Sequence, residues 1–241
     1  MPISAATIFA TAKLPPIDSG HEETKGESVL KSPIFYLFVF GLFLGGSAEC
    51  VMSGWASSYL ESALGLPKIV GDIFGVALFG ALGGVGRMLY SKYGKNIEKT
   101  LLISAIGTTL CYIIAAISPI PAICVLACAL TGLGIAMMWP GTLIAASKKF
   151  AAGGVVMYAF LAAGGDLGAA LGPQLVGVIV DAVPTVDFLV KIAESLSMTP
   201  DTLGMRIGIL FGALFPLVLI GVYAYIIKKQ KQEEKQNSEI Q

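Results

Sequence analysis

The sequence contains little charge and few of the groups that enzymes use. Only 13% of its 241 residues are Asp, Glu, Lys or Arg, whereas a soluble domain carries about 25%. The single histidine is His21, and the sequence has no nucleophile–base pair, phosphate-binding loop, dinucleotide-binding turn or metal-ligand spacing. The formal net charge is zero, which gives no sign of a nucleic-acid partner. We therefore expect neither a soluble domain nor an enzyme, and no metal, cofactor or nucleic acid.

The four cysteines carry no signature of a redox or metal site. Cys50, Cys111, Cys124 and Cys128 all fall in apolar runs. Cys124 and Cys128 are one helical turn apart, but no histidine or carboxylate joins them at the spacing of metal ligands. All four are expected to be buried small residues.

Long apolar runs dominate the rest of the chain, which is 55% hydrophobic with a mean hydropathy of +0.79. A bilayer core of about 30 Å requires about 20 apolar residues per helix. Lipid offers the backbone no hydrogen-bond partner, and the runs lack the alternation of barrel strands, so each run must be a helix. The sequence therefore predicts an all-α membrane protein with six transmembrane helices, over residues 34–59, 69–90, 100–118, 121–147, 154–180 and 203–227.

The basic residues predict the orientation of these spans, because Lys and Arg collect on the cytoplasmic side of membranes. With both termini inside, only Lys68, Lys191 and Arg206 of the 16 Lys and Arg fall in outer segments. We therefore expect a multi-pass protein of the cell membrane with both termini in the cytoplasm.

Three parts of the chain follow from this topology. Residues 1–32 are rich in helix breakers after a short apolar piece, which predicts a cytoplasmic linker. Residues 33–228 are expected to form the six-helix bundle, and residues 229–241 a charged cytoplasmic tail. The outer segment before the sixth span is long, and its apolar residues at helical spacing predict a short amphipathic helix at the outer interface.

The loop after the second span carries a motif. In one half of a major facilitator superfamily transporter, this loop reads close to Gly-x-x-x-Asp-Arg-x-Gly-Arg-Lys, and the stretch RMLYSKYGKN resembles it. Gly94 and Lys95 match its Gly-Arg and Lys92 stands for its Arg, whereas Ser91 replaces the Asp and Arg87 the first Gly. This weakened form is similar to the loop of the C-terminal half.

Further stretches resemble the same family. LTGLGIAMMWPGTLIAAS is similar to its tenth helix, LAAGGDLGAALGPQLVGVIVD to its eleventh, and TIFATAKLPP to a sixth helix entering the central loop. The last match implies that residues 1–32 are a remnant of that loop. GGSAECVMSGWASSYL and the pair Gly86–Arg87 resemble the fucose permease-like sugar branch.

The resemblance implies half of a major facilitator fold, with a 3+3 inverted repeat. It further implies a secondary active transporter that moves a small polar solute such as a sugar by proton symport. The family's cavity lies between two halves, so the expected partners are the lipid bilayer, the solute, and either an N-terminal half chain or a second copy. The alternative is a non-transporting membrane fragment or an assembly partner of a split carrier.

Two mid-span carboxylates are the leading candidates for binding a proton or a polar substrate. A charge at this depth costs about 2.5–3.5 kcal/mol on insertion scales, so it calls for a reason. Glu49 and Asp166 both have small residues on the same helical face, which suits a cavity or a bundle interior. The alternative for each is a structural hydrogen bond to a neighbouring helix.

Other candidates are less specific. Trp55 could stack on a sugar ring, although an interfacial anchor is the favoured interpretation. Gln174 could line a cavity, although a bond between helices is favoured. Pro140 cannot bond the Ala136 carbonyl, so we expect a kink that is either a gate or simply shape. The gating or loop motif comprises Gly86, Arg87, Lys92, Gly94 and Lys95, although topology alone also explains its charges.

Small residues recur every fourth position in three places, which predicts close helix contacts. These ladders are Gly164, Gly168 and Gly172; Gly80 and Gly84; and Gly208 and Gly212.

Overall fold

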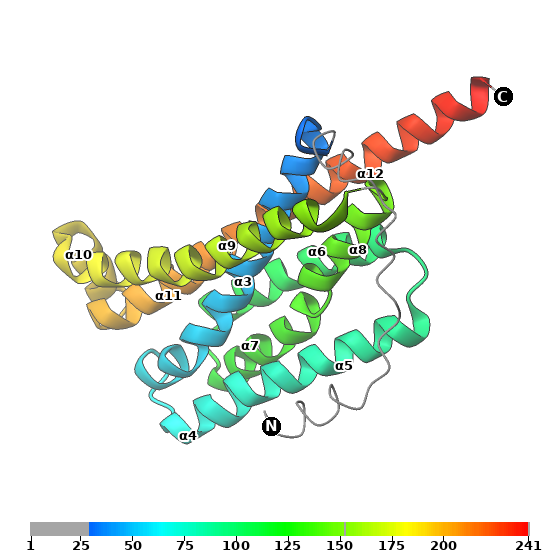
Figure 1. Ribbon diagram of the computed structural model, residues 1–241. Helices are drawn as coiled ribbons and strands as arrows, with labels where there is room; N and C mark the ends of the chain where they lie inside the picture. The colour runs from blue at the N-terminus through cyan, green and yellow to red at the C-terminus, as the bar shows by residue number, and fades with distance from the viewer. Residues whose placement is uncertain (1–28, 152, 241) are drawn as a thin grey trace.

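The chain forms a helical bundle in a computed structural model that describes residues 29–151 and 153–240 (Figure 1). Six helical runs in this part are long and apolar enough to cross a membrane. Each coincides with a predicted span, which confirms the all-α, six-span prediction. The linker predicted at residues 1–32 lies almost wholly outside the described residues. The six runs are Pro33–Ser62, Lys68–Tyr93, Ile97–Ile117, Pro121–Lys149, Gly154–Thr185 and Pro200–Glu233.

Several spans consist of more than one element. The first and third are the single helices α3 (Pro33–Ser62) and α6 (Ile97–Ile117). The second contains a π-helical stretch, and the fourth is broken near its middle. The remaining elements are α4 (Lys68–Val70), η2 (Gly71–Ala77) and α5 (Leu78–Tyr93); α7 (Pro121–Ile135) and α8 (Met138–Lys149); α9 (Gly154–Ala182) and η3 (Val183–Thr185); α10 (Asp187–Ser195); and α11 (Pro200–Gly212) and α12 (Leu214–Ile240).

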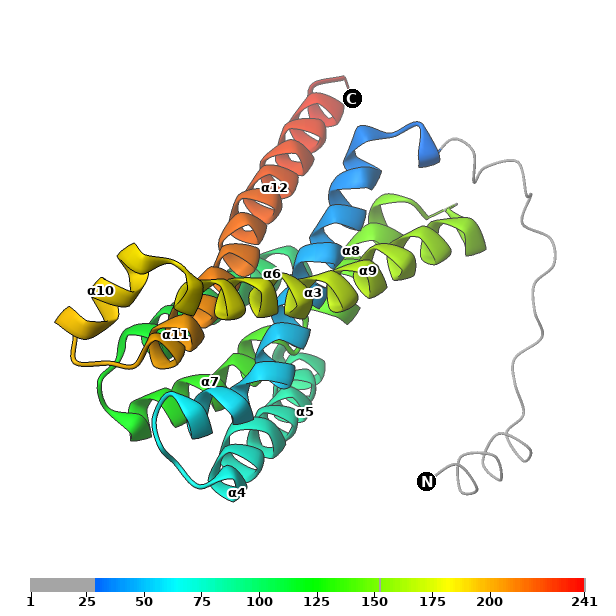
Figure 2. The same cartoon turned by 90° about the vertical axis from the view of Figure 1, so that its left-hand side faces the viewer.

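Helix α3 is the centre of the bundle. It contacts α9, η2, α12, α11, α8 and α7, and Figures 1 and 2 show α9 crossing it. Two buried tyrosines join α3 to α6: Tyr59 donates to the Ala115 carbonyl (2.5 Å) and Tyr112 to the Ala48 carbonyl (2.6 Å). Each hydroxyl therefore keeps a partner where water is absent.

The contact between α3 and α9 depends on glycine. A Cβ atom on Gly164 would lie 2.9 Å from the Val39 carbonyl oxygen, and one on Gly172 would lie 2.8 Å from the Ser47 Cα. One on Gly168 would overlap the backbone of Phe43. Ser47 Oγ also donates to the Gly168 carbonyl at 3.0 Å. This ladder therefore makes the predicted close contact.

The other two ladders differ from each other. A Cβ on Gly208 would lie 2.6 Å from a Val180 methyl, and one on Gly212 2.8 Å from the Tyr112 ring, so this pair is close-packed as predicted. A Cβ on Gly80 or Gly84 would meet nothing within 4 Å among the described residues. The prediction of a close contact at Gly80 and Gly84 is thus wrong for the chain by itself, because this face of α5 is open.

The predicted amphipathic helix is present as α10. Leu189 and Ile192 pack against a small cluster of Val183, Ala193 and Leu203, whereas Phe188 and Leu196 are exposed. Figure 1 shows α10 and α4 at the left end of the bundle, and the charged end of α12 extending beyond it at the right. Helix α12 continues to Ile240, so the predicted charged tail is helical. Glu233 of this helix forms an ion pair with Lys149 of α8.

Candidate functional site

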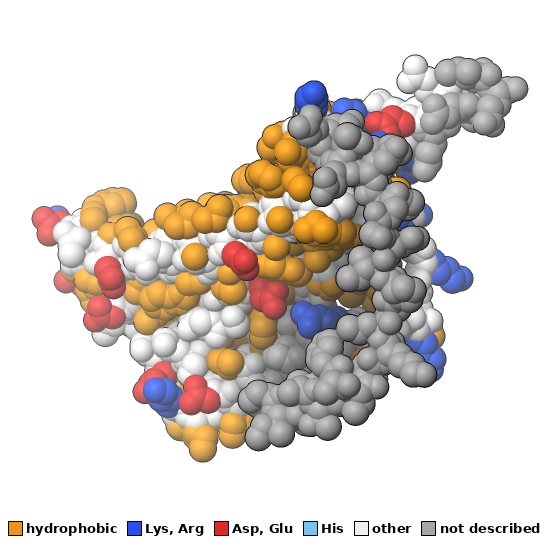
Figure 3. All heavy atoms as spheres, in the orientation of Figure 1, with side chains coloured by type: hydrophobic (Ala, Val, Ile, Leu, Met, Phe, Trp, Pro, Cys, Tyr) orange, Lys and Arg blue, Asp and Glu red, His pale blue; other side chains and the backbone are white. Residues whose placement is uncertain are grey.

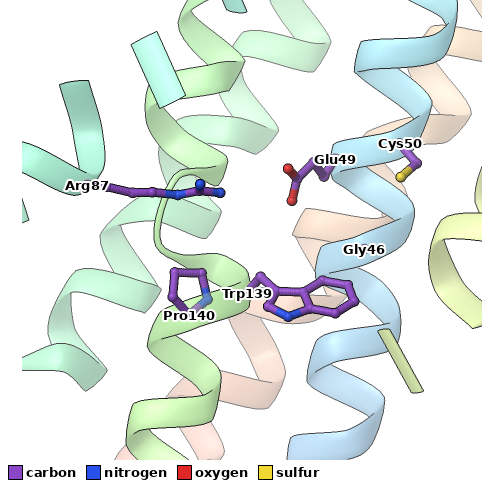
Figure 4. A pocket seen from close by; sticks show the side chains of 6 residues that line it. All are labelled: Gly46, Glu49, Cys50, Arg87, Trp139 and Pro140. Atoms are coloured by element: carbon purple, nitrogen blue, oxygen red, sulfur yellow. The ribbon is translucent and has the colours of Figure 1, made fainter. Parts of the chain in front are cut away.

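A cavity of about 420 Å³ opens between α3, α5 and the start of α8. A smaller hollow of about 170 Å³ shares its two charged residues, Glu49 and Arg87. Figure 4 shows these two side chains extending toward each other from opposite sides of the gap. The larger cavity is lined by Gly46, Glu49, Cys50, Arg87, Trp139 and Pro140.

Glu49 enters the cavity from α3 and is half-buried. Gly46, one turn earlier, also lines the cavity, and a Cβ atom there would strike the Gly165 carbonyl oxygen of α9. Within residues 29–151 and 153–240, no hydrogen bond or ion pair within 4 Å joins Glu49 to Arg87. The carboxylate therefore faces a cation across open space, which is an arrangement that a ligand or a proton can alter.

Arg87 lies inside α5, six residues before the helix ends at Tyr93. The span predicted over residues 69–90 already includes Arg87, and the helix continues through the first part of the motif. Arg87 Nε donates to the Ala136 carbonyl at 3.1 Å. The side chain is thus anchored to the fourth span rather than directed into the cytoplasm.

The Ala136 carbonyl needs this donor because of Pro140. A proline has no N–H, so the carbonyl four residues before it loses its helical partner. Helix α7 ends at Ile135 and α8 begins at Met138, so the fourth span breaks at this point. The predicted kink at Pro140 is confirmed, and Arg87 supplies the missing donor.

Gly86 permits this contact. A Cβ at Gly86 would lie 2.5 Å from the Ala136 Cβ and 3.1 Å from the Leu133 carbonyl oxygen. No other residue type fits without moving α5 away from α7. Gly86 therefore allows α5 to approach α7 closely enough for Arg87 to reach the Ala136 carbonyl.

Trp139 and Cys50 complete the lining, and neither was predicted there. The Trp139 ring packs against Gly165 of α9, where a Cβ atom would strike it. Cys50 is half-buried beside Glu49, whereas Cys124 and Cys128 are buried. The expectation that all four cysteines are buried is therefore wrong for Cys50 and for the half-buried Cys111. Pro140 marked the position of Trp139, but nothing in the sequence marked Cys50.

The remaining substrate candidates lie outside this cavity. Asp166 and Gln174 have exposed side chains on α9. Trp55 Nε1 donates to the Pro173 carbonyl at 3.2 Å, and its ring lies against Gly177. Trp55 thus fastens α3 to α9. The structure does not bring these three residues together with Glu49.

The loop residues also lie away from the cavity. Gly94 follows the last residue of α5, and Lys92 Nζ lies 5.4 Å from the Tyr93 ring centre. Lys95 is exposed in the short connection to α6. Their part in gating stays a prediction. Among the described residues, no group of three His, Cys, Asp or Glu side chains could hold a metal ion.

The cavity opens on an exposed face of the bundle. The second and fifth spans are the least buried of the six, and Leu167, Leu171 and Leu175 of α9 are exposed. Figure 3 shows acidic and basic side chains near the middle of one such face, between patches of apolar side chains.

The sequence matches the family model described as Major Facilitator Superfamily over residues 3–173. No curated protein and no solved structure was found to match the chain. The matched range includes the first four spans and more than half of α9.

Proposed function

Because the chain belongs to the Major Facilitator Superfamily of membrane transporters, we propose that its cavity carries a small polar solute, such as a sugar, by proton symport. Glu49 takes the coupling proton, and Arg87 and Trp139 contact the solute.

The observation that carries the proposal is the pair Glu49 and Arg87, facing each other across an open cavity within membrane-spanning helices. Charged side chains at this depth are costly and mark substrate or proton pathways. A carboxylate that faces a cation without binding it can release and bind a proton as the cavity changes.

The break at Pro140 supports a moving element. Discontinuous helices form the binding sites of many secondary transporters, and here the break lies directly beside the cavity. We propose that α8 shifts relative to α7 during transport, with the Arg87 bond to Ala136 marking the joint. Gly86, Lys92, Gly94 and Lys95 belong to the proposed inward gate.

The exposed face around the cavity supports a further six-helix unit. Transporters of this kind bind substrate between two repeat units related by an axis along the membrane normal. We propose that an N-terminal half or a second copy covers the second and fifth spans, and that the assembly lies in the cell membrane with both termini cytoplasmic. Asp166 and Gln174 would then face that unit.

The test is solute uptake by vesicles containing the full chain, alone and with an N-terminal half-carrier. Glu49→Gln should abolish accumulation driven by a pH gradient while solute exchange persists. Glu61→Gln, an exposed carboxylate at the end of the same helix, is the matched control and should transport normally. Unchanged pH-driven uptake in Glu49→Gln would contradict the proposal. Absence of any uptake or binding would favour the alternative, a non-transporting assembly partner.

A further inference from the structure

The chain's two arginines are bonded differently. Arg206 donates from its terminal Nη1 to the Ala116 and Ser118 carbonyls, at 2.9 and 3.0 Å, and so closes the end of α6. Among the described residues, Arg87 donates only through Nε, to the Ala136 carbonyl. Its terminal nitrogens make no hydrogen bond to a described residue, and Figure 4 shows them directed into the cavity.

We propose that the substrate carries a carboxylate, which Arg87 binds through its two terminal nitrogens; this inference rests on the proposed function. A guanidinium presents two parallel N–H groups that match the two oxygens of a carboxylate. The hydrogen bond from Nε to the Ala136 carbonyl fixes the plane of the guanidinium and leaves the edge formed by its two terminal nitrogens free. Arg87 is thus orientated for an anion before the anion arrives.

The charge of the cavity favours an anion over a neutral solute. Glu49 and Arg87 are the only charged residues among its lining residues, and together they are neutral. When Glu49 binds a proton, Arg87 is left without an opposite charge, which is costly in a membrane interior. A bound carboxylate restores neutrality. The empty and the loaded cavity are then both neutral. In either state the carrier can change between its inward-facing and outward-facing forms without moving net charge across the membrane.

The remaining lining residues indicate what the rest of the substrate is like. Trp139 and Pro140 offer a flat apolar wall, on which the carbon face of a sugar ring can lie. Glu49 accepts hydrogen bonds from hydroxyl groups on the opposite side. The substrate class that fits both features and the carboxylate is a sugar acid.

The experiment compares each hexose with its hexuronate: D-glucose with D-glucuronate, and D-galactose with D-galacturonate. The full chain is purified into nanodiscs in a Trp55→Phe background, which leaves Trp139 as its only tryptophan. Quenching of Trp139 fluorescence then reports binding in the cavity. At least one hexuronate should bind more tightly than its hexose, and Arg87→Gln should weaken that binding roughly tenfold to a hundredfold.

Lys191→Gln is the control, because Lys191 is an exposed cation on α10, outside the cavity. Should Arg87→Gln fail to fold, alkylation of Cys50 in the unaltered chain provides the second measurement, and hexuronate but not hexose should slow it. Equal binding of hexose and hexuronate, or acid binding that Arg87→Gln leaves unchanged, would overturn the inference while a sugar carrier remains. If neither class binds or is taken up, the proposed function fails as well.

Discussion

Arg87 of α5 donates a hydrogen bond to the carbonyl of Ala136, the one carbonyl that Pro140 leaves without its helical donor. A residue on the second span thus completes the broken backbone of the fourth. The same side chain has its other edge in the cavity, opposite Glu49. One residue therefore connects the cavity to the helix break.

This connection predicts that Arg87 and Pro140 are energetically coupled. Arg87→Met removes the donor and leaves the buried Ala136 carbonyl unsatisfied, which should lower the free energy of unfolding by about 1–3 kcal/mol. Pro140→Ala restores a backbone N–H four residues after Ala136. In the double variant, the loss caused by Arg87→Met should therefore shrink, with a coupling of about 0.5 kcal/mol or more.

The measurement is unfolding of the purified chain in detergent, for the wild type, the two single variants and the double variant. Strictly additive effects would show that Arg87 does not substitute for the missing N–H group.

The spacing between α5 and α7 gives a second prediction. Gly86→Ala should destabilise the chain, because its new methyl group would overlap the Ala136 side chain. Gly84→Ala, on the same helix, meets nothing within 4 Å in the described structure and should stabilise it by up to about 1 kcal/mol through helix propensity. Thermal unfolding of both variants checks the opposite signs. Equal shifts in both would mean that α5 does not depend on close approach at Gly86.

The sequence predicted the spans well, because each apolar run is a local property of the chain. It also located the break at Pro140 and the close-packed glycines of α9, which follow from single residue types. The contact that Arg87 makes was not predicted, because the basic loop directly after it is the stronger signal. Its true partner, Ala136, depends on how closely α5 and α7 approach, and that is a contact between distant parts of the chain.

Asp166 is a second residue whose surroundings the sequence could not predict. Its small neighbours suited a cavity, as did those of Glu49, and the sequence could not distinguish the two. Gly164 and Gly168 turn the opposite face of α9 toward α3, so Asp166 is left exposed. Which face of a helix turns inward is decided by packing against its neighbours, not by the helix's own pattern.

The other arginine should be structural. Arg206 donates to two carbonyls at the end of α6, where no helical donor follows. Arg206→Met should therefore lower stability by about 1–3 kcal/mol and leave substrate affinity unchanged. Lys191→Met, at an exposed site on α10, should leave both unchanged. Unfolding and binding measured on the same samples separate the two roles, and a loss of affinity in a folded Arg206→Met protein would contradict this assignment.

Chemical labelling of Cys50 should test whether water enters the cavity. Maleimides react with thiolates that water can reach, so Cys50 in the cavity should be labelled much faster than the buried Cys124 and Cys128. Mass spectrometry of the digested chain identifies each labelled site, and Cys50→Ala should remove the fast reaction. If a second unit covers this face in the membrane, an impermeant maleimide should reach Cys50 only through the cavity mouth, and a solute bound between Arg87 and Glu49 should block it. Labelling of Cys50 no faster than that of Cys124 would mean that water does not enter the space between α3 and α8.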